Sequence, residues 1–274
     1  GDLLRLTALR GRLMEAGPQE GPLAGAMAVA HTDADSVREA LVGYPGVEIA
    51  AFNAPRSVTV SGPVTVVDAF CAGVSFRTQR LTVSHAFHSA AMEGAVAPFA
   101  EAVAATRLHA PKVPFVSTAT GDWHTAATAT DPRVWAEAIR RPVLFTQALA
   151  RAGEAGGKVF WEVGPHPVLT TLGRSTLTGD TLAWHHTLRR DHSDQGELHK
   201  GVAAHYSAGD TDIDWAAVHA GKGQRVMTIP TYPFDRQRLV VPAFRAAPVT
   251  TPADQGPAGH PLFDRHYVNQ SEEL

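Results

Sequence analysis

Two histidines that stand three residues apart carry the strongest chemical signal in this sequence. His85 and His88 occur in TVSHAFHSAAM, directly after a strand-like stretch and directly before a helix-like one. Loops at the strand ends of α/β folds commonly carry catalytic groups. For an isolated HxxH pair, a simpler interpretation is that one histidine packs against the fold while the other is solvated. A metal role is disfavoured, because the pattern is not HExxH and no carboxylate separates the two histidines.

Two further segments are open to a functional or a structural interpretation. Arg10 lies in LRLTALRGRLM, where its planar guanidinium could pair with a carboxylate or simply be a surface cation of a helix. His166 lies in WEVGPHPVL, where glycine and proline residues follow an apolar strand and predict a rigid turn. Neither segment decides between these interpretations by itself.

The elements that must position these residues alternate between strand and helix patterns. Hydrophobic residues make up 44% of the chain, which is enough for a sizeable core. Residues 25–83 have the order β-α-β-β-α-β, which is typical of a small ferredoxin-like insert. Helices near 92–106, 132–140 and 145–155 alternate with short strands at 114–118 and 158–164, which predicts an α/β layer architecture. A further helix is predicted at 196–207, and residues 246–259 have the composition of a flexible linker.

The composition excludes several classes of protein. The net charge is −3 and the basic residues are scattered singly, so the sequence has no polycationic stripe for nucleic acid. Cys71 is the single cysteine, which excludes a disulfide framework and a cysteine-rich zinc site. No apolar run approaches the roughly 20 residues that cross a bilayer, and the first residues form a charged amphipathic pattern instead of a signal peptide. These observations predict a soluble, cytoplasmic protein with no membrane partner.

The order and spacing of six motifs resemble the acyltransferase domain of type I polyketide synthases. The motifs are ALRGRLM, GAMAVA, NAPRSVTVSG, VSHAFHSAAM, RRPVLF and EVGPHPVL. The series is similar, more distantly, to the malonyl-CoA:acyl carrier protein transacylases of fatty acid synthesis. The match covers residues 1–180 and implies part of an α/β-hydrolase-like core with the ferredoxin-like insert. Residues 181–245, which end near YPFDRQR, resemble the linker that follows this domain, and HPLFDRHY resembles the opening of a dehydratase domain in 260–274.

The resemblance assigns roles to individual residues. It makes His88 the base, which must take a proton from a serine hydroxyl that attacks a thioester and then protonate the leaving thiolate. It implies that a backbone carbonyl near Ala138 orients this imidazole, although many relatives carry an amide side chain at that position. It matches Arg10 to the arginine that binds the free carboxylate of malonyl. Asn53 is either a pocket residue or a turn residue before Pro55.

The HAFH motif, from His85 to His88, implies a preference for malonyl. Relatives that choose methylmalonyl tend to have YASH, where a small third residue leaves room for the α-methyl group. Phe87 is expected to fill that space, and His85 belongs to the same substrate-binding set. One methyl group in an apolar pocket is worth only about 1–3 kcal/mol, so the expected preference is not absolute.

The sequence contains no GxSxG, the motif that presents a nucleophilic serine on a sharp strand-to-helix turn. The nearest sequence is GRSTL, but it lacks the final glycine and follows a helix-like stretch, so Ser175 is not the expected nucleophile. The family order places the serine and much of the oxyanion hole upstream of Gly1, so this chain alone is expected to be inactive. His260 likewise lacks the glycine of the dehydratase HxxxGxxxxP motif.

The leading hypothesis is therefore malonyl transfer from coenzyme A to a carrier-protein phosphopantetheine through a seryl ester, with no tightly bound cofactor and no metal. The expected partners are malonyl-CoA, the acyl carrier protein domain and the ketosynthase domain of the same synthase. The alternative is a non-catalytic docking scaffold, in which the insert and YPFDRQR contact neighbouring domains. A third hypothesis is a metal cluster, although solvated histidines explain the same residues more simply: His185, His186, His192, His199 and His205.

Overall fold

The structure is a computed structural model of the 274-residue chain, and it describes residues 1–16, 24–209, 211–221 and 232. The chain forms two units, Gly1–Asp214 and Trp215–Leu274. In the described part of the second unit there is one short helix, α10 (Trp215–Val218). The expected YPFDRQR segment beyond its first residue, the flexible linker at 246–259 and the dehydratase start at 260–274 lie outside the described residues.

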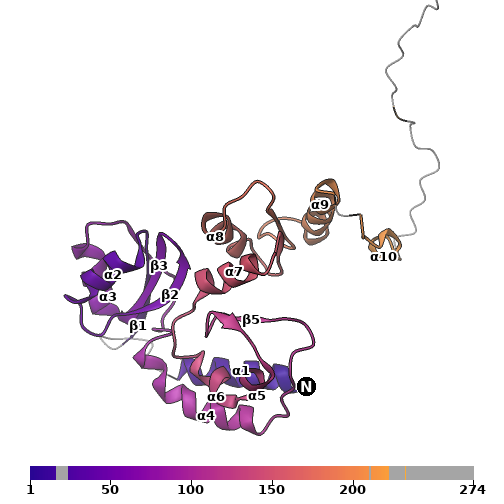
Figure 1. Ribbon diagram of the computed structural model, residues 1–274. Coiled ribbons are helices and arrows are strands. Elements are labelled where there is room, and N and C mark those ends of the chain that lie inside the picture. Colours follow the sequence, from indigo (N-terminus) through magenta and orange to yellow (C-terminus); the bar gives the residue numbers. More distant parts are fainter. Residues whose placement is uncertain (17–23, 210, 222–231, 233–274) are drawn as a thin grey trace, which may run out of the picture. The chain divides into compact units, whose positions relative to one another are not determined.

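The ferredoxin-like insert predicted for residues 25–83 is confirmed. Its four strands form an antiparallel sheet in the order β2-β3-β1-β4. Figure 1 shows the two helices together on one side of this sheet. The elements are β1 (Gly25–Ala30), α2 (Ala34–Leu41), β2 (Glu48–Ala54), β3 (Ser57–Pro63), α3 (Val64–Gly73) and β4 (Thr78–Arg80).

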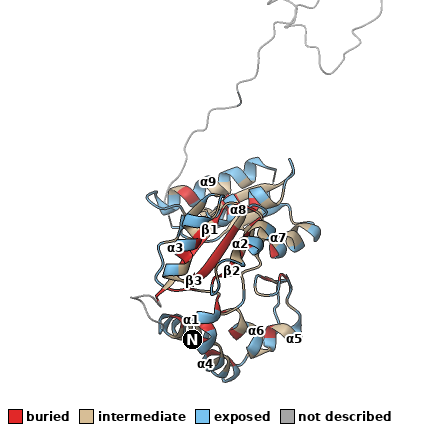
Figure 2. Cartoon of the chain, turned by 90° about the vertical axis from the view of Figure 1, so that its left-hand side faces the viewer, coloured by how far each residue is buried: buried red, intermediate tan, exposed pale blue. Residues whose placement is uncertain are grey.

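Small and branched side chains build the core of this insert. Ala26, Ala28 and Ala30 occupy every second position of β1 and are fully buried, as expected for the inner face of a pleated strand. Figure 2 shows buried positions concentrated along β1 and β3. The small alanines of the central strand leave room for larger side chains of the same cluster, which include Val37, Val47, Val58, Val60, Val67 and Phe70.

A second core joins helices that come from distant parts of the sequence. Helix α1 (Asp2–Glu15) packs against α4 (Glu93–Ala104), and α4 packs against α6 (Pro132–Glu137). The 3-10 turn η1 (Ala90–Met92) precedes α4, and α5 (Ala126–Thr130) precedes α6. The buried members of this core are Met14, Met92, Ala95, Phe99, Val103, Ala136 and Ile139. The packing brings the α1 motif close to the HAFH segment that leads into η1.

The remainder of the first unit is organised around two short parallel strands. β7 (Val159–Glu162) pairs with β8 (Ala183–His186) in parallel. Helices α8 (Leu169–Thr176) and α9 (Asp194–Ser207) pack against this pair, and α7 (Phe145–Glu154) packs against α8. A small hairpin consists of β5 (Val116–Ser117) and β6 (Asp122–Trp123). Helices and strands thus share one α/β unit, as the alternating pattern predicted.

The expected boundary at residue 180 does not coincide with the end of this unit. The sequence analysis assigned residues 181–245 to a linker, but β8 is hydrogen-bonded to β7 and the unit continues to Asp214. A four-residue strand is too short to show a clear alternation between turn-rich segments, which is why the pattern did not reveal it. Across the described ranges, no helix is both long and apolar enough to cross a membrane.

Candidate active site

His88 lies in the loop between β4 and η1, with its backbone in the left-handed region at φ 57°. Residues other than glycine seldom adopt this conformation, and such strain is concentrated at functional sites. The next residue, Ser89, caps η1 and donates a hydrogen bond from its hydroxyl to the Ala86 carbonyl. Gly25 allows the loop to pass closely over β1, because a Cβ atom there would overlap backbone atoms of His85 and Ala86. The loop is therefore fixed from two sides.

The imidazole of His88 is held by a backbone carbonyl. Its Nδ1 lies 2.9 Å from the carbonyl oxygen of Arg141. Because a carbonyl can only accept, Nδ1 carries the proton and Nε2 of the neutral ring is the acceptor. This is the tautomer that a general base needs.

The orienting carbonyl differs from the one expected near Ala138. The nearest acceptor belongs to Arg141, three residues further on, while the backbone of Ala138 makes a second, supporting contact with the ring. Ala138 caps the end of α6, and the last carbonyl groups of a helix lack partners within the helix. The chain turns after this helix, so more than one free carbonyl reaches the same imidazole.

Burial lowers the pKa of His88 below its ordinary value of 6.5. The carbonyl of Arg141 opposes this shift, and the positive charge of Arg10 adds to it. The net effect keeps the ring neutral at pH 7, and the neutral ring is the form that can accept a proton.

Arg10 shares two cavities with His88. The larger, of about 440 Å³, is lined by both residues together with Gly11, Met14, Glu15, Met27 and Phe87. The smaller, of about 210 Å³, contains both residues and the turn after α6. Burial lowers the pKa of the Arg10 guanidinium, and no carboxylate of the described chain forms an ion pair with it. A half-buried cation without an internal counterion is a candidate site for an anionic ligand.

The first and third residues of HAFH have different surroundings. Phe87 lines the larger cavity with Arg10, whereas His85 lines a separate one beside β1. His85 is buried, with Nδ1 3.1 Å from the Ser84 hydroxyl and Nε2 3.3 Å from the Glu15 carbonyl oxygen. Its ring stacks on Phe87, with the centroids 5.5 Å apart. His85 therefore supports Phe87 and does not line the cavity that contains His88.

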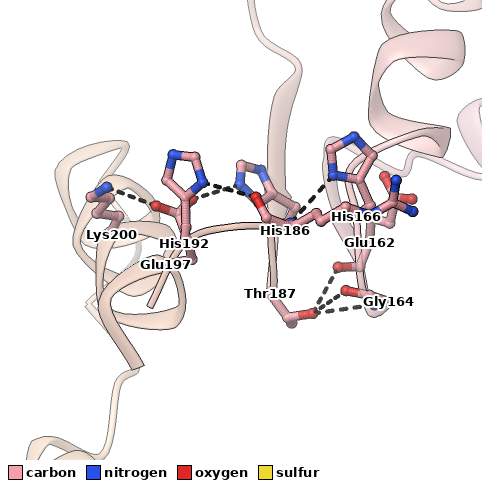
Figure 3. A network of polar contacts seen from close by, with 9 residues as sticks. Glu162, Gly164, His166, His186, Thr187, His192, Glu197 and Lys200 are labelled. Carbon is pink, nitrogen blue, oxygen red and sulfur yellow. Dashed lines mark hydrogen bonds and ion pairs between the residues drawn. The ribbon is translucent and has the colours of Figure 1, made fainter. Parts of the chain in front are cut away.

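Two other candidates are placed outside both cavities. Asn53 lies on β2, and its side-chain amide donates to the Thr59 hydroxyl at 2.8 Å across the β2–β3 hairpin. This contact supports the turn interpretation of Asn53 and not the pocket interpretation. His166 lies in the turn after β7, where its Nδ1 accepts from the Arg190 backbone N–H at 3.4 Å (Figure 3).

Ser175 lies on α8, and its hydroxyl donates to the Leu172 carbonyl at 2.8 Å. It therefore has the geometry of an exposed helical serine and not of a strand-to-helix elbow. Ser89, which follows His88 directly, is buried and bonded to the Ala86 carbonyl.

Three histidines of the alternative metal cluster, His185, His186 and His205, lie in two structural networks. His185 is 7% exposed, and its ring contacts the rings of Trp161 and His205, with centroids 4.8 Å and 5.3 Å away. His186 contacts Glu197 at 3.1 Å (Figure 3). The solvated-histidine explanation is thus wrong for His185, because β8 pairs with β7 and buries it. Over the residues that the structure describes, no group of three His, Cys, Asp or Glu is arranged to hold a metal ion.

Glu197 is the centre of the second network. Lys200 donates to its Oε1 at 2.7 Å, and His186 contacts its Oε2. Lys200 and then His186 lower the pKa of Glu197 to about 2. Figure 3 shows this chain of contacts beside the turn that contains His166. It fixes α9 against β8 and does not reach His88.

Two residues that the structure places at the site were not predicted from the sequence. Arg141 provides the orienting carbonyl, and Thr118 lines the smaller cavity with Arg10 and His88. The position of Arg141 inside RRPVLF was a usable signal, because that motif directly follows the predicted helix. Thr118 had no comparable signal, since it lies in the short loop after β5.

The fold and these cavities define an α/β protein with a ferredoxin-like insert, in which a neutral histidine and a half-buried arginine line a common space. The chain belongs to the acyl transferase domain family, whose profile matches residues 2–212. The expected resemblance to acyltransferase domains of polyketide synthases is confirmed at this level.

Individual relatives agree with this family. Polyketide synthase GfsB of Streptomyces halstedii is 38% identical over 246 residues, which are 86% of this chain and 4% of that synthase. The acyltransferase domain from the second module of the salinomycin polyketide synthase has a TM-score of 0.74 and 36% identity, over 85% of this chain and 54% of that structure. A malonyl-CoA:acyl carrier protein transacylase from Xanthomonas oryzae pv. oryzae has a TM-score of 0.64 and 25% identity, over 74% and 64% of the two chains. The chain thus spans about half of the first of these domain structures.

Proposed function

We propose that this chain provides the base and the carboxylate-binding arginine of an acyltransferase that moves malonyl from malonyl-CoA to the phosphopantetheine of an acyl carrier protein. One observation carries the proposal: His88 and Arg10 line the same two cavities, and Nδ1 of His88 is held by a carbonyl so that Nε2 is the acceptor. The name of the Xanthomonas relative gives the same donor and acceptor.

In the first half-reaction, Nε2 of His88 takes the proton from a serine hydroxyl as its oxygen attacks the thioester carbonyl. The tetrahedral intermediate then collapses, the carbon–sulfur bond breaks, and the imidazolium returns the proton to the sulfur of coenzyme A. The product is a malonyl seryl ester. The Arg141 carbonyl stabilises the imidazolium through Nδ1–H, as a carboxylate does in a catalytic triad.

In the second half-reaction, the same nitrogen takes the proton from the phosphopantetheine thiol. The thiolate attacks the ester carbonyl, and the serine oxygen leaves with the proton from His88. The thiol needs no metal or redox partner for this exchange, because the thioester formed resembles the thioester consumed. Arg10 holds the distal carboxylate of malonyl throughout, since a guanidinium can make two parallel hydrogen bonds to a carboxylate.

The proposed preference for malonyl over methylmalonyl rests on Phe87. Its ring lines the cavity that contains Arg10 and is kept in place by the stacked ring of His85. An α-methyl group would compete with this ring for space. The discrimination is about 1–3 kcal/mol, because only one methyl group is involved.

The nucleophilic serine is proposed to lie on a segment outside these 274 residues, since the sequence has no GxSxG and Ser175 is helical. Residues after Asp214 would then form the remaining linker, with residues 260–274 as the start of a dehydratase domain. The carrier domain and the ketosynthase domain of the same synthase are the proposed partners. The alternative is a non-catalytic docking scaffold. Covalent labelling with malonyl-CoA distinguishes this alternative from the proposed acyltransferase.

The test is covalent labelling with radioactive malonyl-CoA. A complete acyltransferase domain that contains these residues should form an ester-linked malonyl label, and His88→Gln should slow its formation by about 10²- to 10⁴-fold, the usual contribution of a general base. The matched control is His166→Gln, which should label at the normal rate. The 274-residue chain alone should not be labelled. An ester on this chain alone, or normal labelling of His88→Gln, would contradict the proposal.

A further inference from the structure

The segment that orients His88 is joined to the edge of the ferredoxin-like sheet. Val143 donates from its N–H to the Ala50 carbonyl at 2.8 Å and accepts from the Phe52 N–H at 2.8 Å. These bonds form a parallel bridge between β2 and residue 143. The Thr146 hydroxyl adds a bond to the Phe52 carbonyl at 3.0 Å. The chain that presents the Arg141 carbonyl is therefore hydrogen-bonded alongside β2, the edge strand of the insert.

Arg140 links this segment to two other elements. Its guanidinium contacts Oε2 of Glu48 at 2.9 Å and Oε2 of Glu93 at 3.3 Å. Glu48 is the first residue of β2, and Glu93 is the first residue of α4. The side chains of Arg140 and Glu48 are 29% and 36% exposed, so this ion pair is less accessible to solvent than the ion pairs Arg38–Asp35 and Arg151–Glu154. One cation thus connects the insert, the orienting segment and the helix that follows the HAFH loop.

Glu48 also contacts the loop that carries His88. Its second oxygen, Oε1, accepts from the Ala90 backbone N–H at 3.1 Å. Ala90 is two residues after His88, and Arg140 is one residue before Arg141. The Glu48–Arg140 pair therefore touches the chain on both sides of the hydrogen bond between His88 and Arg141.

We propose that Arg140 is a positioning residue for the base: through Glu48 and Glu93 it holds the His88 loop and the Arg141 carbonyl in register, and so maintains the proton on Nδ1 of His88. The left-handed backbone at His88 needs such support, because a strained conformation persists only where the surroundings over-determine it. An exposed ion pair by itself contributes little to stability. The effect of this pair should therefore appear at the imidazole and not mainly in the stability of the fold. Only the catalytic consequence rests on the proposed function.

Arg151 provides a matched control. It also contacts two carboxylates, Asp122 at 3.5 Å and Glu154 at 3.1 Å, and its side chain is 49% exposed. It lies on α7 and lines neither cavity that His88 shares with Arg10. Removing the charge of Arg151 tests whether the loss of any arginine that contacts two carboxylates changes the tautomer of His88.

The experiment is nitrogen-15 NMR of the histidine rings of the 274-residue chain at pH 8, with the His88 signals assigned from His88→Gln. The wild-type ring should be the Nδ1–H tautomer. Arg140→Met should convert it to a mixture with Nε2–H, Arg140→Lys should restore most of the Nδ1–H form, and Arg151→Met should change nothing. If Arg140→Met does not fold, Glu48→Gln keeps the arginine and should still reduce the Nδ1–H fraction. A folded Arg140→Met or Glu48→Gln variant with the wild-type tautomer, or an equal change in Arg151→Met, overturns the proposal.

A second measurement separates this inference from the proposed function. In a complete acyltransferase domain, Arg140→Met should lower kcat for malonyl transfer by about 10²-fold, the effect of a small misplacement of a catalytic group. KM for malonyl-CoA should stay within about twofold, because Arg140 lines neither cavity shared by His88 and Arg10. If the tautomer changes and kcat does not, the positioning role is supported and the role of His88 as base fails. If kcat falls while the tautomer is unchanged, the positioning role is wrong.

Discussion

The carbonyl oxygen of Arg141 lies 2.9 Å from Nδ1 of His88, although the two residues are 53 positions apart in the sequence. This hydrogen bond selects one neutral tautomer of the ring. It uses a backbone group where a catalytic triad uses a carboxylate, so the group that orients the imidazole adds no negative charge that would repel an anionic substrate. The neighbouring cation, Arg10, acts in the same direction, because it attracts an anion and disfavours the charged form of His88.

Replacing Arg10 should change the choice of substrate. In a complete domain, Arg10→Ala should lower kcat/KM for malonyl-CoA by roughly 10- to 150-fold, the equivalent of the 1.5–3 kcal/mol of a charge-assisted hydrogen bond. Use of acetyl-CoA should rise relative to malonyl-CoA, because acetyl then no longer faces an unpaired cation. Competition between the two thioesters measures the ratio. Arg12→Ala, on the exposed part of the same helix, is the control, and equal losses for both substrates would make Arg10 a structural residue.

When kcat/KM is plotted against pH, the loss of activity on the acidic side should have its midpoint below pH 6.5. Burial and the charge of Arg10 lower the pKa of His88 in the folded protein, so at pH 6.5 more of the ring is in the neutral, basic form than in an ordinary histidine. Arg10→Ala should move this midpoint of kcat/KM upward for acetyl-CoA, which does not need the arginine. A midpoint that stays in place would show that the two groups do not interact.

The same shift predicts how His88 affects folding. Between the folded pKa and 6.5 the unfolded chain binds more protons than the folded chain, so stability falls as the pH is lowered through this window. His88→Gln should reduce that pH dependence, as measured by urea unfolding at a series of pH values.

Exchanging HAFH for YASH should raise the use of methylmalonyl. In the double variant His85→Tyr and Phe87→Ser, the loss of the Phe87 ring opens the larger cavity, and contact with one methyl group recovers about 1 kcal/mol. The methylmalonyl to malonyl ratio should therefore rise by at most about tenfold. The single variant Phe87→Ser should have most of this effect, since Phe87 lines the larger cavity and His85 does not. An active double variant with an unchanged ratio would exclude Phe87 from the substrate pocket.

Glu162 should stabilise the start of α8. Its carboxylate accepts hydrogen bonds from the backbone N–H groups of Val168, Leu169 and Thr170 at 3.0, 3.0 and 2.8 Å. Burial opposes its ionisation, but these bonds outweigh burial and lower its pKa below 4.5. Glu162→Gln should cost about 1–3 kcal/mol of unfolding free energy at pH 7. Glu154→Gln, at the exposed C-terminal end of α7, is the control.

The pH dependence provides a second check on Glu162. A carboxylate with a lowered pKa stabilises the fold above pH 4.5, and this contribution is lost as the pH falls through the folded-state pKa. The difference between wild type and Glu162→Gln in urea unfolding should therefore narrow below pH 4.5. A constant difference would mean that the charge of Glu162 contributes nothing.

The sequence by itself determined the order of the elements in the insert and the place of the HAFH loop. Alternating alanine and valine residues mark the strands, and glycine and proline residues mark the turns, because both signals depend on neighbours within a few residues. That Arg10 and His88 belong to the same site was also predictable from the sequence, but only through the order of the six motifs. The strand β8 was missed, since AWHH is short and its partner β7 lies more than twenty residues earlier.

Only the tertiary structure decided which carbonyl holds His88, and which of the HAFH side chains line the cavity with Arg10. Every residue has a backbone carbonyl, so no residue type identifies the one from Arg141; its position follows from the end of α6 and from the bonds between Val143 and β2. His85 and Phe87 are similar candidates by sequence. His85 is buried because the loop passes closely over Gly25 and because the imidazole contacts the carbonyl of Glu15. Phe87, in contrast, lines the cavity that contains His88. These contacts join segments far apart in the chain, and their geometry is set by packing and not by local pattern.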